Sequence, residues 1–262
     1  MSPGKRFVIK GFISSHIISA MILAFAADAF AAIPLITDDT GTQGKGNFQL
    51  ELLGQYEHDS KERIFAKTAG LLATLTYGII DPVDIILNVP YRAWQTEDSG
   101  SVVKGNGIAD LAIEAKWRLY EEGGLSFALK PGFTIPTGDE QKGLGAGRMR
   151  YYLNLIATKK MRPWELDLNL AYIRNENTVG ERKNIWFASF DVQAEVVENL
   201  KLALDAGVAT NPDGSSNTPL AYILGGLIWS LRENFDIGLG VKGGLTRPET
   251  DISVRGGITW RF

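Results

Sequence analysis

The sequence contains no cysteine among its 262 residues and only two histidines, His16 and His58. The absence of cysteine excludes disulfide bonds, thiolate metal sites and a cysteine nucleophile. A Ser-His-Asp triad needs a histidine as general base, and a metal centre built from several histidines needs more of them than this chain has. These shortages argue against an enzyme, and we predict no cofactor and no metal site.

Long apolar runs are also missing after residue 32. A membrane-spanning helix needs about 18 or more consecutive apolar residues, so none is expected in that part of the chain. Clusters of basic residues, which mark surfaces that bind nucleic acid, are absent as well, and the formal net charge is −3. We therefore expect no nucleic acid partner.

The N-terminus has the layout of a secretory signal peptide. Three basic residues among the first ten precede the mostly apolar segment GFISSHIISAMILAFAA, and Ala29-Phe30-Ala31 offers small residues for cleavage before Ala32. This order is typical of exported proteins. The alternative is an uncleaved membrane helix, but the apolar segment is short and is interrupted by two serines and a histidine. We assign residues 1–31 to a signal peptide.

Apolar and polar residues alternate through most of the remaining chain. In WELDLNLAYI, for example, apolar residues alternate with Glu165, Asp167 and Asn169. A period of two is typical of strands with two unlike faces. Twelve such segments are predicted, at residues 46–57, 66–79, 83–95, 106–120, 124–136, 147–160, 163–175, 184–198, 199–210, 218–231, 234–246 and 251–262.

The connections between these segments alternate in length. Tight turns such as IIDPV and YEEGG alternate with longer polar loops such as TEDSGSVVKG and RNENTVGERK. The glycine-rich TGDEQKGLGAGRMR lacks the Gly-Lys-Ser/Thr of a phosphate-binding loop, and we interpret it as a flexible loop. Short and long connections in alternation indicate a chain that runs up and down between two different compartments.

Two architectures fit such strands. In a soluble sandwich the apolar face lies in the core, whereas in a transmembrane barrel it meets lipid and the polar face lines the interior. The predicted strands reach the roughly 9–11 residues needed to cross a bilayer. Aromatic residues also lie near strand ends, as in lipid-facing girdles: Tyr77, Tyr91, Trp94, Trp117, Tyr120, Trp164, Tyr172, Trp229 and Trp260. We predict an all-β fold, a transmembrane antiparallel up-and-down β-barrel of about 12 strands over residues 46–262.

The C-terminal segment ISVRGGITWRF is an alternating strand that ends in an aromatic residue. Because hydrocarbon offers no hydrogen-bond partner to a free strand edge, this last strand must pair with the first, NFQLELLGQYEH. It resembles the C-terminal assembly signal of bacterial outer-membrane barrels, which Trp260 and Phe262 match. The resemblance implies a bacterial outer-membrane location, with membrane lipid, lipopolysaccharide and the barrel-assembly machinery as partners.

Three segments resemble the MetA-pathway phenol-degradation family: PLITDDTGTQGKGNFQLE, GNGIADLAIEAKWRLY and LKPGFTIPTGDEQKGLGAG. The family's Gly-x-Gly-Asp step is looser here, because Asp110 follows three residues after the second glycine, Gly107. The similarity extends over nearly the whole chain after residue 31, in the same order. It implies an outer-membrane protein described as a transporter.

The polar face of the predicted strands carries many charges. Two roles are open for these side chains, namely pairing that holds the wall together and a lining that selects and orients a solute. The alternation places the following residues in the lumen: Glu51, Asp84, Arg92, Asp110, Glu114, Lys116, Arg118, Lys130, Arg148, Arg150, Asp167, Asp191, Glu195, Asp205, Lys242, Arg255 and Arg261.

The bore and its entrance can also be predicted. Eight strands leave an interior filled by side chains and sixteen leave an open channel, so twelve strands predict a narrow bore. The segment AIPLITDDTGTQGKG has no strand pattern after Pro34. We hypothesise that residues 32–45 form a periplasmic segment that enters the mouth or lumen as a plug.

Two weaker chemical signals remain in the sequence. His58 lies beside Asp59 and Ser60 in a predicted loop, but adjacent residues on one loop rarely have triad geometry, which favours a solvated histidine. Carboxylate-only calcium binding in TDDTGT or NPDGSSN competes with ordinary turn chemistry, which we favour.

The sequence thus predicts a barrel that lets small solutes cross passively. Aromatic or hydrophobic solutes follow from the family resemblance alone, and no individual solute is predicted. Three alternatives stay open: a non-conducting structural or adhesion barrel, a soluble periplasmic ligand-binding barrel, and a barrel enzyme.

Overall fold

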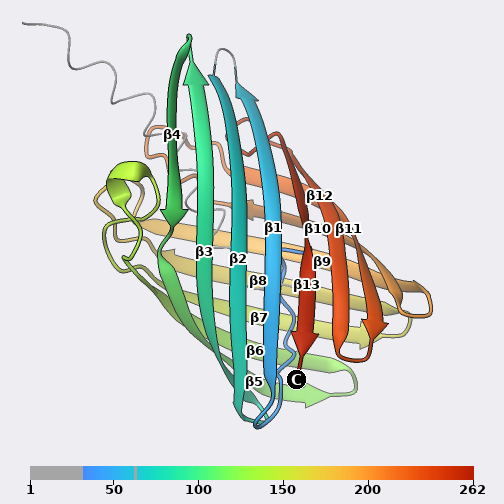
Figure 1. The fold of residues 1–262 in the computed structure, drawn as a ribbon. Coiled ribbons are helices and arrows are strands. Elements are labelled where there is room, and N and C mark those ends of the chain that lie inside the picture. Colours follow the sequence, from blue (N-terminus) through green and yellow to red (C-terminus); the bar gives the residue numbers. More distant parts are fainter. Residues whose placement is uncertain (1–31, 62–63) are drawn as a thin grey trace, which may run out of the picture.

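The computed structural model describes residues 32–61 and 64–262, so the predicted signal peptide lies outside the described residues. Within them, one sheet curls round until its ends meet, and every pair of neighbouring strands is antiparallel (Figure 1). No helix of the described residues is long and apolar enough to cross a membrane.

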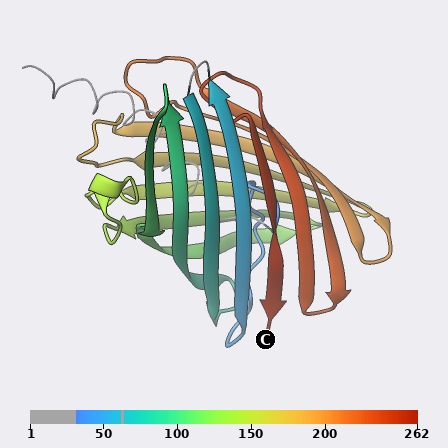
Figure 2. The ribbon, with the colours of Figure 1, turned by 45° about the horizontal axis from the view of Figure 1, so that its top comes forward.

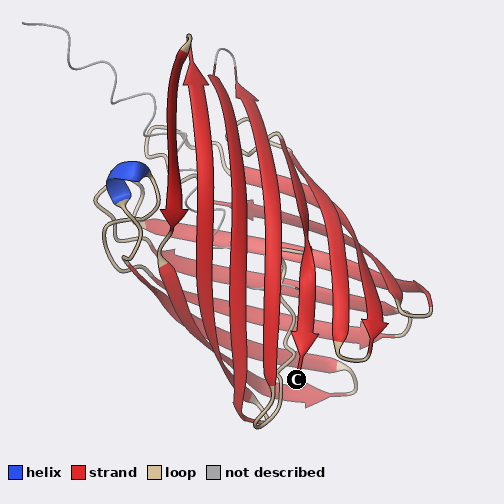
Figure 3. Ribbon diagram, in the orientation of Figure 1, coloured by secondary structure: helices blue, strands red, loops and turns tan. Residues whose placement is uncertain are grey.

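The described residues form thirteen strands and one short 3-10 helix (Figure 3). In chain order these are β1 (Phe48–Lys61), β2 (Ile64–Ile80), β3 (Val83–Asp98), β4 (Ser101–Ile108), β5 (Leu111–Glu122), β6 (Leu125–Ile135), η1 (Glu140–Lys142), β7 (Tyr151–Met161), β8 (Trp164–Arg174), β9 (Asn184–Val197), β10 (Leu200–Ala209), β11 (Leu220–Arg232), β12 (Phe235–Gly244) and β13 (Ile252–Arg261).

Around the wall, β4 and β5 share a single position because both pair with β3. β4 pairs with its second half and β5 with its first half. The chain leaves strand geometry between them at Ala109 and Asp110, where the Asp110 carboxylate accepts hydrogen bonds from the backbone N–H groups of Gly138 (3.1 Å) and Ala146 (2.9 Å). The predicted antiparallel up-and-down barrel of about 12 strands is therefore confirmed.

Two predicted loops are strand for part of their length. The segment TEDSGSVVKG forms the end of the β3–β4 hairpin, and β1 continues to Lys61. His58 therefore pairs with Lys67 and Ile252 inside the sheet instead of lying in a loop. A strand of 16 residues such as β3 is longer than the roughly 9–11 residues needed to cross a bilayer. The outer end of β3 therefore lies outside the bilayer, in water, where polar residues can continue the strand.

The two faces of the wall differ in chemistry as the alternation predicts. On the outer face Leu168 and Leu239 are 43% and 57% exposed, whereas Asp167 and Lys242, which lie on the same two strands and face the barrel interior, are 1% and 4% exposed. An apolar exterior and an ionic interior form a stable arrangement when hydrocarbon surrounds the barrel and water enters it.

Trp94 departs from the predicted aromatic girdle. It is buried at 6% exposure, while Tyr91 and Trp117 on the outer face are 42% and 50% exposed. The reason is that every second residue of β3 faces inward, and Trp94 belongs to the same alternating set as Asn88 and Arg92. Its indole N–H then finds a partner inside, the carbonyl oxygen of Lys142 at 2.9 Å.

The C-terminal strand closes the ring by pairing with β1 along its whole length. Phe262 and Phe48 exchange backbone hydrogen bonds of 2.9 and 2.7 Å, and their rings stack with centroids 5.7 Å apart. Trp260 packs against Phe262 with a centroid distance of 4.9 Å. The role of Trp260 and Phe262 as an assembly signal stays a prediction.

Candidate functional site

Residues 32–45, called the inner segment below, run inside the barrel behind β1 and β13 (Figures 1 and 2). They have no strand partner, so their contacts come from side chains that project inward from the wall. These contacts involve strands on opposite sides of the ring. The lumen and this segment together form the candidate functional site.

An apolar cluster anchors the first residues of the inner segment. Leu35 and Ile36 are 1% and 4% exposed and pack against inward-facing Tyr222 and Leu224 of β11. On the other side, Ile33 packs against Leu53 and Leu72 of β1 and β2. Full burial of each such side chain is worth about 1.5–3 kcal/mol.

Three inward-facing glycines of β11 and β12 make room for this anchor. A Cβ atom on Gly226 or Gly240 would lie 2.7 or 2.8 Å from Cγ of Pro34, and one on Gly238 would overlap the carbonyl oxygen of Ile33. Side chains at these positions would therefore occupy the volume that the inner segment fills.

The substitution Gly238→Val is expected to expel the inner segment, because the new side chain and Ile33 cannot share the same space. Protease cleavage near residue 33 should become fast in the folded barrel. Gly243→Val is the matched control on the same strand, since a Cβ there meets nothing within 4 Å. Equal resistance to protease in both variants would show that the glycines do not position the segment.

Wall side chains also bind the backbone of the inner segment. The Asp205 carboxylate accepts hydrogen bonds from the N–H groups of Ile36 (2.6 Å) and Thr37 (2.9 Å). Arg255 donates to the carbonyl oxygens of Pro34 (2.8 Å) and Leu35 (3.2 Å). These bonds supply the partners that buried backbone groups require.

Asn169 of β8 adds a two-way contact further along the segment. Its side-chain oxygen accepts from the Asp38 N–H at 3.1 Å, and its Nδ2 donates to the Asp38 carbonyl at 2.7 Å. Asn169 is 1% exposed. One side chain therefore satisfies both backbone groups of Asp38, much as a neighbouring strand would.

The side chain of Asp38 lies between two lysines. One carboxylate oxygen is 2.9 Å from Nζ of Lys116, and the other is bonded to Nζ of Lys130. The side chains of Asp38, Lys116 and Lys130 are 4%, 10% and 1% exposed. This buried ion triad joins the inner segment to β5 and β6.

The last part of the inner segment is fixed at the end of the barrel where the turns are short. The N–H of Gln43 donates to the Asp84 carboxylate at 3.1 Å, and the N–H of Lys45 donates to Asp81 at 3.1 Å. Short turns lie on the periplasmic side of outer-membrane barrels. Entry of the inner segment from the periplasm stays a prediction.

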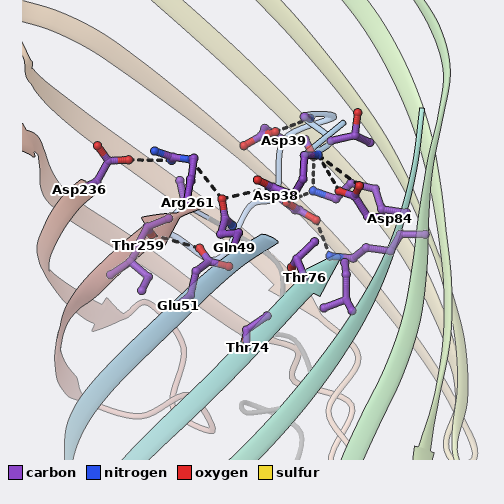
Figure 4. Close-up of a pocket in the computed structure, with 18 of the residues that line it drawn as sticks. Asp38, Asp39, Gln49, Glu51, Thr74, Thr76, Asp84, Asp236, Thr259 and Arg261 are labelled. Carbon is purple, nitrogen blue, oxygen red and sulfur yellow. Dashed lines mark hydrogen bonds and ion pairs between the residues drawn. The ribbon is translucent and has the colours of Figure 1, made fainter. Parts of the chain in front are cut away.

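A cavity of about 360 Å³ remains between the inner segment and the wall, with lining residues from β1, β2, β3, β12 and β13 on one side and from β5, β6 and β7 on the other (Figure 4). Its lining is mainly polar. The labelled lining residues are Asp38, Asp39, Gln49, Glu51, Thr74, Thr76, Asp84, Asp236, Thr259 and Arg261.

The carboxylates of this cavity fall into two groups. Asp38 is paired with lysines, and Asp236 is 2.7 Å from Arg261. Among the described residues, Glu51, Asp39 and Asp84 form no ion pair; Glu51 accepts a hydrogen bond from the neutral hydroxyl of Thr259 at 3.3 Å. Lys116, Lys130 and Lys160 also line the cavity, so its charges are mixed, and the carboxylates of Glu51 and Asp84, which form no ion pair, lie on β1 and β3.

The predicted lumen residues occupy three kinds of position. Glu51 and Arg118 are partly exposed, and Arg148 is exposed in the loop before β7 because that strand begins only at Tyr151. Glu195 is exposed and Arg261 is partly exposed. The buried members are Asp84, Arg92, Asp110, Glu114, Lys116, Lys130, Arg150, Asp167, Asp191, Asp205, Lys242 and Arg255.

Some of these residues meet and others do not. Arg150 lies 3.6 Å from Asp110, and Lys242 lies 3.0 Å from Glu249. Asp167 and Asp191 are directly opposite each other on β8 and β9. Lys116 and Arg255 bind the inner segment.

Sequence reasoning did not identify Asn169, Tyr222 or the three glycines as contacts of the inner segment. The glycines are a sequence signal for these contacts. Gly226, Gly238 and Gly240 interrupt apolar strands at alternating positions that face the barrel interior. A strand glycine marks a close approach of another backbone.

In the segment NPDGSSN, one of the two possible calcium-binding segments, the aspartate forms hydrogen bonds within a turn. Asp213 of NPDGSSN accepts hydrogen bonds from the N–H (2.8 Å) and hydroxyl (2.7 Å) of Ser215, which is turn chemistry. Within residues 32–61 and 64–262, no group of three or more histidine, aspartate or glutamate side chains is arranged to hold a metal ion.

Known structures share this fold. The COG4313 outer membrane channel from Pseudomonas putida F1 matches with a TM-score of 0.68 and 14% identity, over 86% of this chain and 98% of that chain. The translocator domain of the autotransporter NalP from Neisseria meningitidis matches with a TM-score of 0.59 and 11% identity, over 97% and 100%. The NanC porin matches with a TM-score of 0.55 and 10% identity, over 80% and 98%. Curated protein sequences gave no match.

The location and the family follow from these observations. A closed barrel with an apolar belt and an ionic interior belongs in the bacterial outer membrane. The family model described as "Putative MetA-pathway of phenol degradation" matches residues 32–262. Since this match includes both the barrel and the inner segment, the chain belongs to that family, as its sequence segments predicted.

Proposed function

We propose that the protein is an outer-membrane channel that lets small solutes cross passively past an inner segment. The observation that carries this proposal is the polar cavity beside the inner segment, within a closed barrel wall. The fold likeness to an outer membrane channel and to a porin supports it. We propose no catalytic role, since the single histidine of the described residues, His58, lies within strand β1.

The proposed solutes are small aromatic compounds that carry a polar group. The family description, which refers to phenol degradation, supports this class. The hydroxyl and amide groups that line the cavity, from Thr74, Thr76, Thr259 and Gln49, could bind a phenolic hydroxyl while the solute passes. Polar groups on a channel wall orient a solute in this way.

A non-conducting scaffold is the second candidate, and the dense contacts of the inner segment favour it. Liposome swelling with the full mature chain separates the two candidates. A channel should admit small sugars and phenols at rates that fall with solute size. Absence of swelling and of single-channel current would support the scaffold instead.

Glu51→Gln is expected to reduce the preference of the channel for cations. A unit charge about 4 Å from a passing ion is worth about 1 kcal/mol in water, which corresponds to about a five-fold change in local cation occupancy. The reversal potential in a salt gradient measures this preference. Glu198→Gln, in an exposed turn, makes the same charge change outside the lumen and should have no effect. An unchanged reversal potential in Glu51→Gln would exclude the cavity from the ion path.

A further inference from the structure

The outer wall carries a second hollow that the lumen does not use. It has a volume of about 500 Å³ and lies where β8, β9 and β10 reach the long loops. We call it the rim groove and define it by Leu170, Trp186, Ala188 and Val208 on the wall, with Arg182 above them.

Strand register explains why the rim groove exists. Ala188 is directly opposite Leu170 on β8 and Val208 on β10. All three side chains face outward, where Leu170 and Val208 are 48% and 43% exposed. A methyl group between two larger side chains leaves a hollow that is open to the surrounding lipid.

Aromatic rings form the next level of the groove, toward the loops. Trp186 is 64% exposed and packs against Tyr172 at a centroid distance of 4.9 Å. The Tyr172 hydroxyl donates to Asn184 at 2.8 Å. Tryptophan and tyrosine in this position mark the level of the lipid headgroups.

Arg182 lies above the aromatic level and is not neutralised. Its Nε and Nη2 donate to the backbone oxygens of Asp213 and Ser216 and to the side-chain oxygen of Asn217. Among the described residues it forms no ion pair. A guanidinium held by neutral acceptors keeps its full charge and has donors left for an anion.

The charges of these loops balance in number, with Arg174, Arg182 and Lys183 against Glu176, Glu181 and Asp213, but Arg182 is the cation that has no ion-pair partner among the described residues. Arg174 and Lys183 share one carboxylate, Glu176, at 2.7 and 3.5 Å. The other two carboxylates of these loops accept hydrogen bonds from neutral donors and are not within ion-pair distance of Arg182. Glu181 is buried and accepts from Asn175, and Asp213 accepts from Ser215.

We propose that the rim groove binds a phosphorylated lipid of the outer leaflet. One acyl chain lies over Ala188, and the phosphate is held by Arg182. The order of apolar hollow, aromatic pair and cation along the wall matches the order of acyl chain, headgroup and phosphate in such a lipid. The Nη1 group of Arg182, which donates to none of these loop oxygens, supplies charge-assisted donors for the phosphate. The inference depends on the membrane location and not on conduction.

The test uses the full mature chain in detergent with lipid A, and the bound lipid is counted by native mass spectrometry. Wild type should retain one lipid A and should bind its dephosphorylated form about ten-fold less well, as loss of a charge-assisted hydrogen bond predicts. Inorganic phosphate should not displace the lipid, because it lacks the acyl chain.

Two variants test the two halves of the groove. Ala188→Leu fills the hollow and should reduce retention of lipid A, while Ala115→Leu, on the far strand β5, should not. Arg182→Gln should remove the preference for the phosphorylated form, and Arg182→Lys should restore part of it. Heat-modifiable gel mobility verifies folding of each variant. Equal binding of both lipid forms by wild type, or unchanged retention in Ala188→Leu, would overturn the proposal.

Discussion

Deletion of residues 32–41 is expected to raise the single-channel conductance several-fold. These residues fill the interior with Leu35, Ile36 and the ion triad around Asp38. A barrel of twelve strands is wide enough to conduct when nothing fills it, since it lies between the filled eight-strand and the open sixteen-strand forms. The measurement is single-channel current in planar bilayers, with wild type at the same salt concentration.

A second variant separates loss of the inner segment from damage to the barrel. Replacing residues 32–41 by glycine and serine of equal length removes every anchoring side chain and keeps the chain length. It should conduct like the deletion, and heat-modifiable gel mobility should remain. Replacing the outer loop residues 212–217 in the same way is the control and should leave the current unchanged. If neither inner variant conducts more than wild type, the inner segment is not the constriction.

Asp38→Asn is expected to destabilise docking of the inner segment by about 3–5 kcal/mol, the usual cost of removing one partner from a buried ion pair. The variant would leave Lys116 and Lys130 as two buried cations without their shared carboxylate. We expect frequent transitions to a higher-conductance state and faster proteolysis of the segment. Both are measured on folded protein, one in bilayers and the other in detergent.

The adjacent residue supplies the control for this prediction. Asp39→Asn makes the same change in charge, but the Asp39 carboxylate is not within ion-pair distance of a described cation and accepts from the N–H of Gly41. Its effect should be small. Adding Lys130→Met to Asp38→Asn removes one buried cation and should restore part of the docking. Equal behaviour of the two asparagine variants would mean that the triad does not hold the segment.

The wall of the barrel could be predicted because the bilayer imposes one strong rule on every strand. Each residue that faces lipid must be apolar, so the alternation alone predicts that Leu168 faces outward and Asp167 faces inward. The rule weakens where a strand leaves the membrane. The alternation therefore places Arg148 in a strand that begins only at Tyr151. It also does not predict the interruption at Asp110, because the cause of that interruption lies in the loop that contains Ala146.

The contacts of the inner segment could not be predicted from the sequence. Asp38 and Lys116 are 78 residues apart, and the residues around each of them do not indicate that the two side chains form an ion pair. The pairing of Asp205 with Ile36 spans 169 residues. Alternation places a side chain inside the barrel, but strand tilt and stagger decide its height there, and these depend on the whole closed ring.

The order of assembly follows from the way the inner segment is held. Its partners lie on β5, β6, β8, β10 and β13, which come together only when the sheet has curved almost completely round. A partly formed sheet offers only some of these side-chain contacts and does not enclose the inner segment. The inner segment precedes every strand in the sequence, yet it can dock only after the ring has nearly closed.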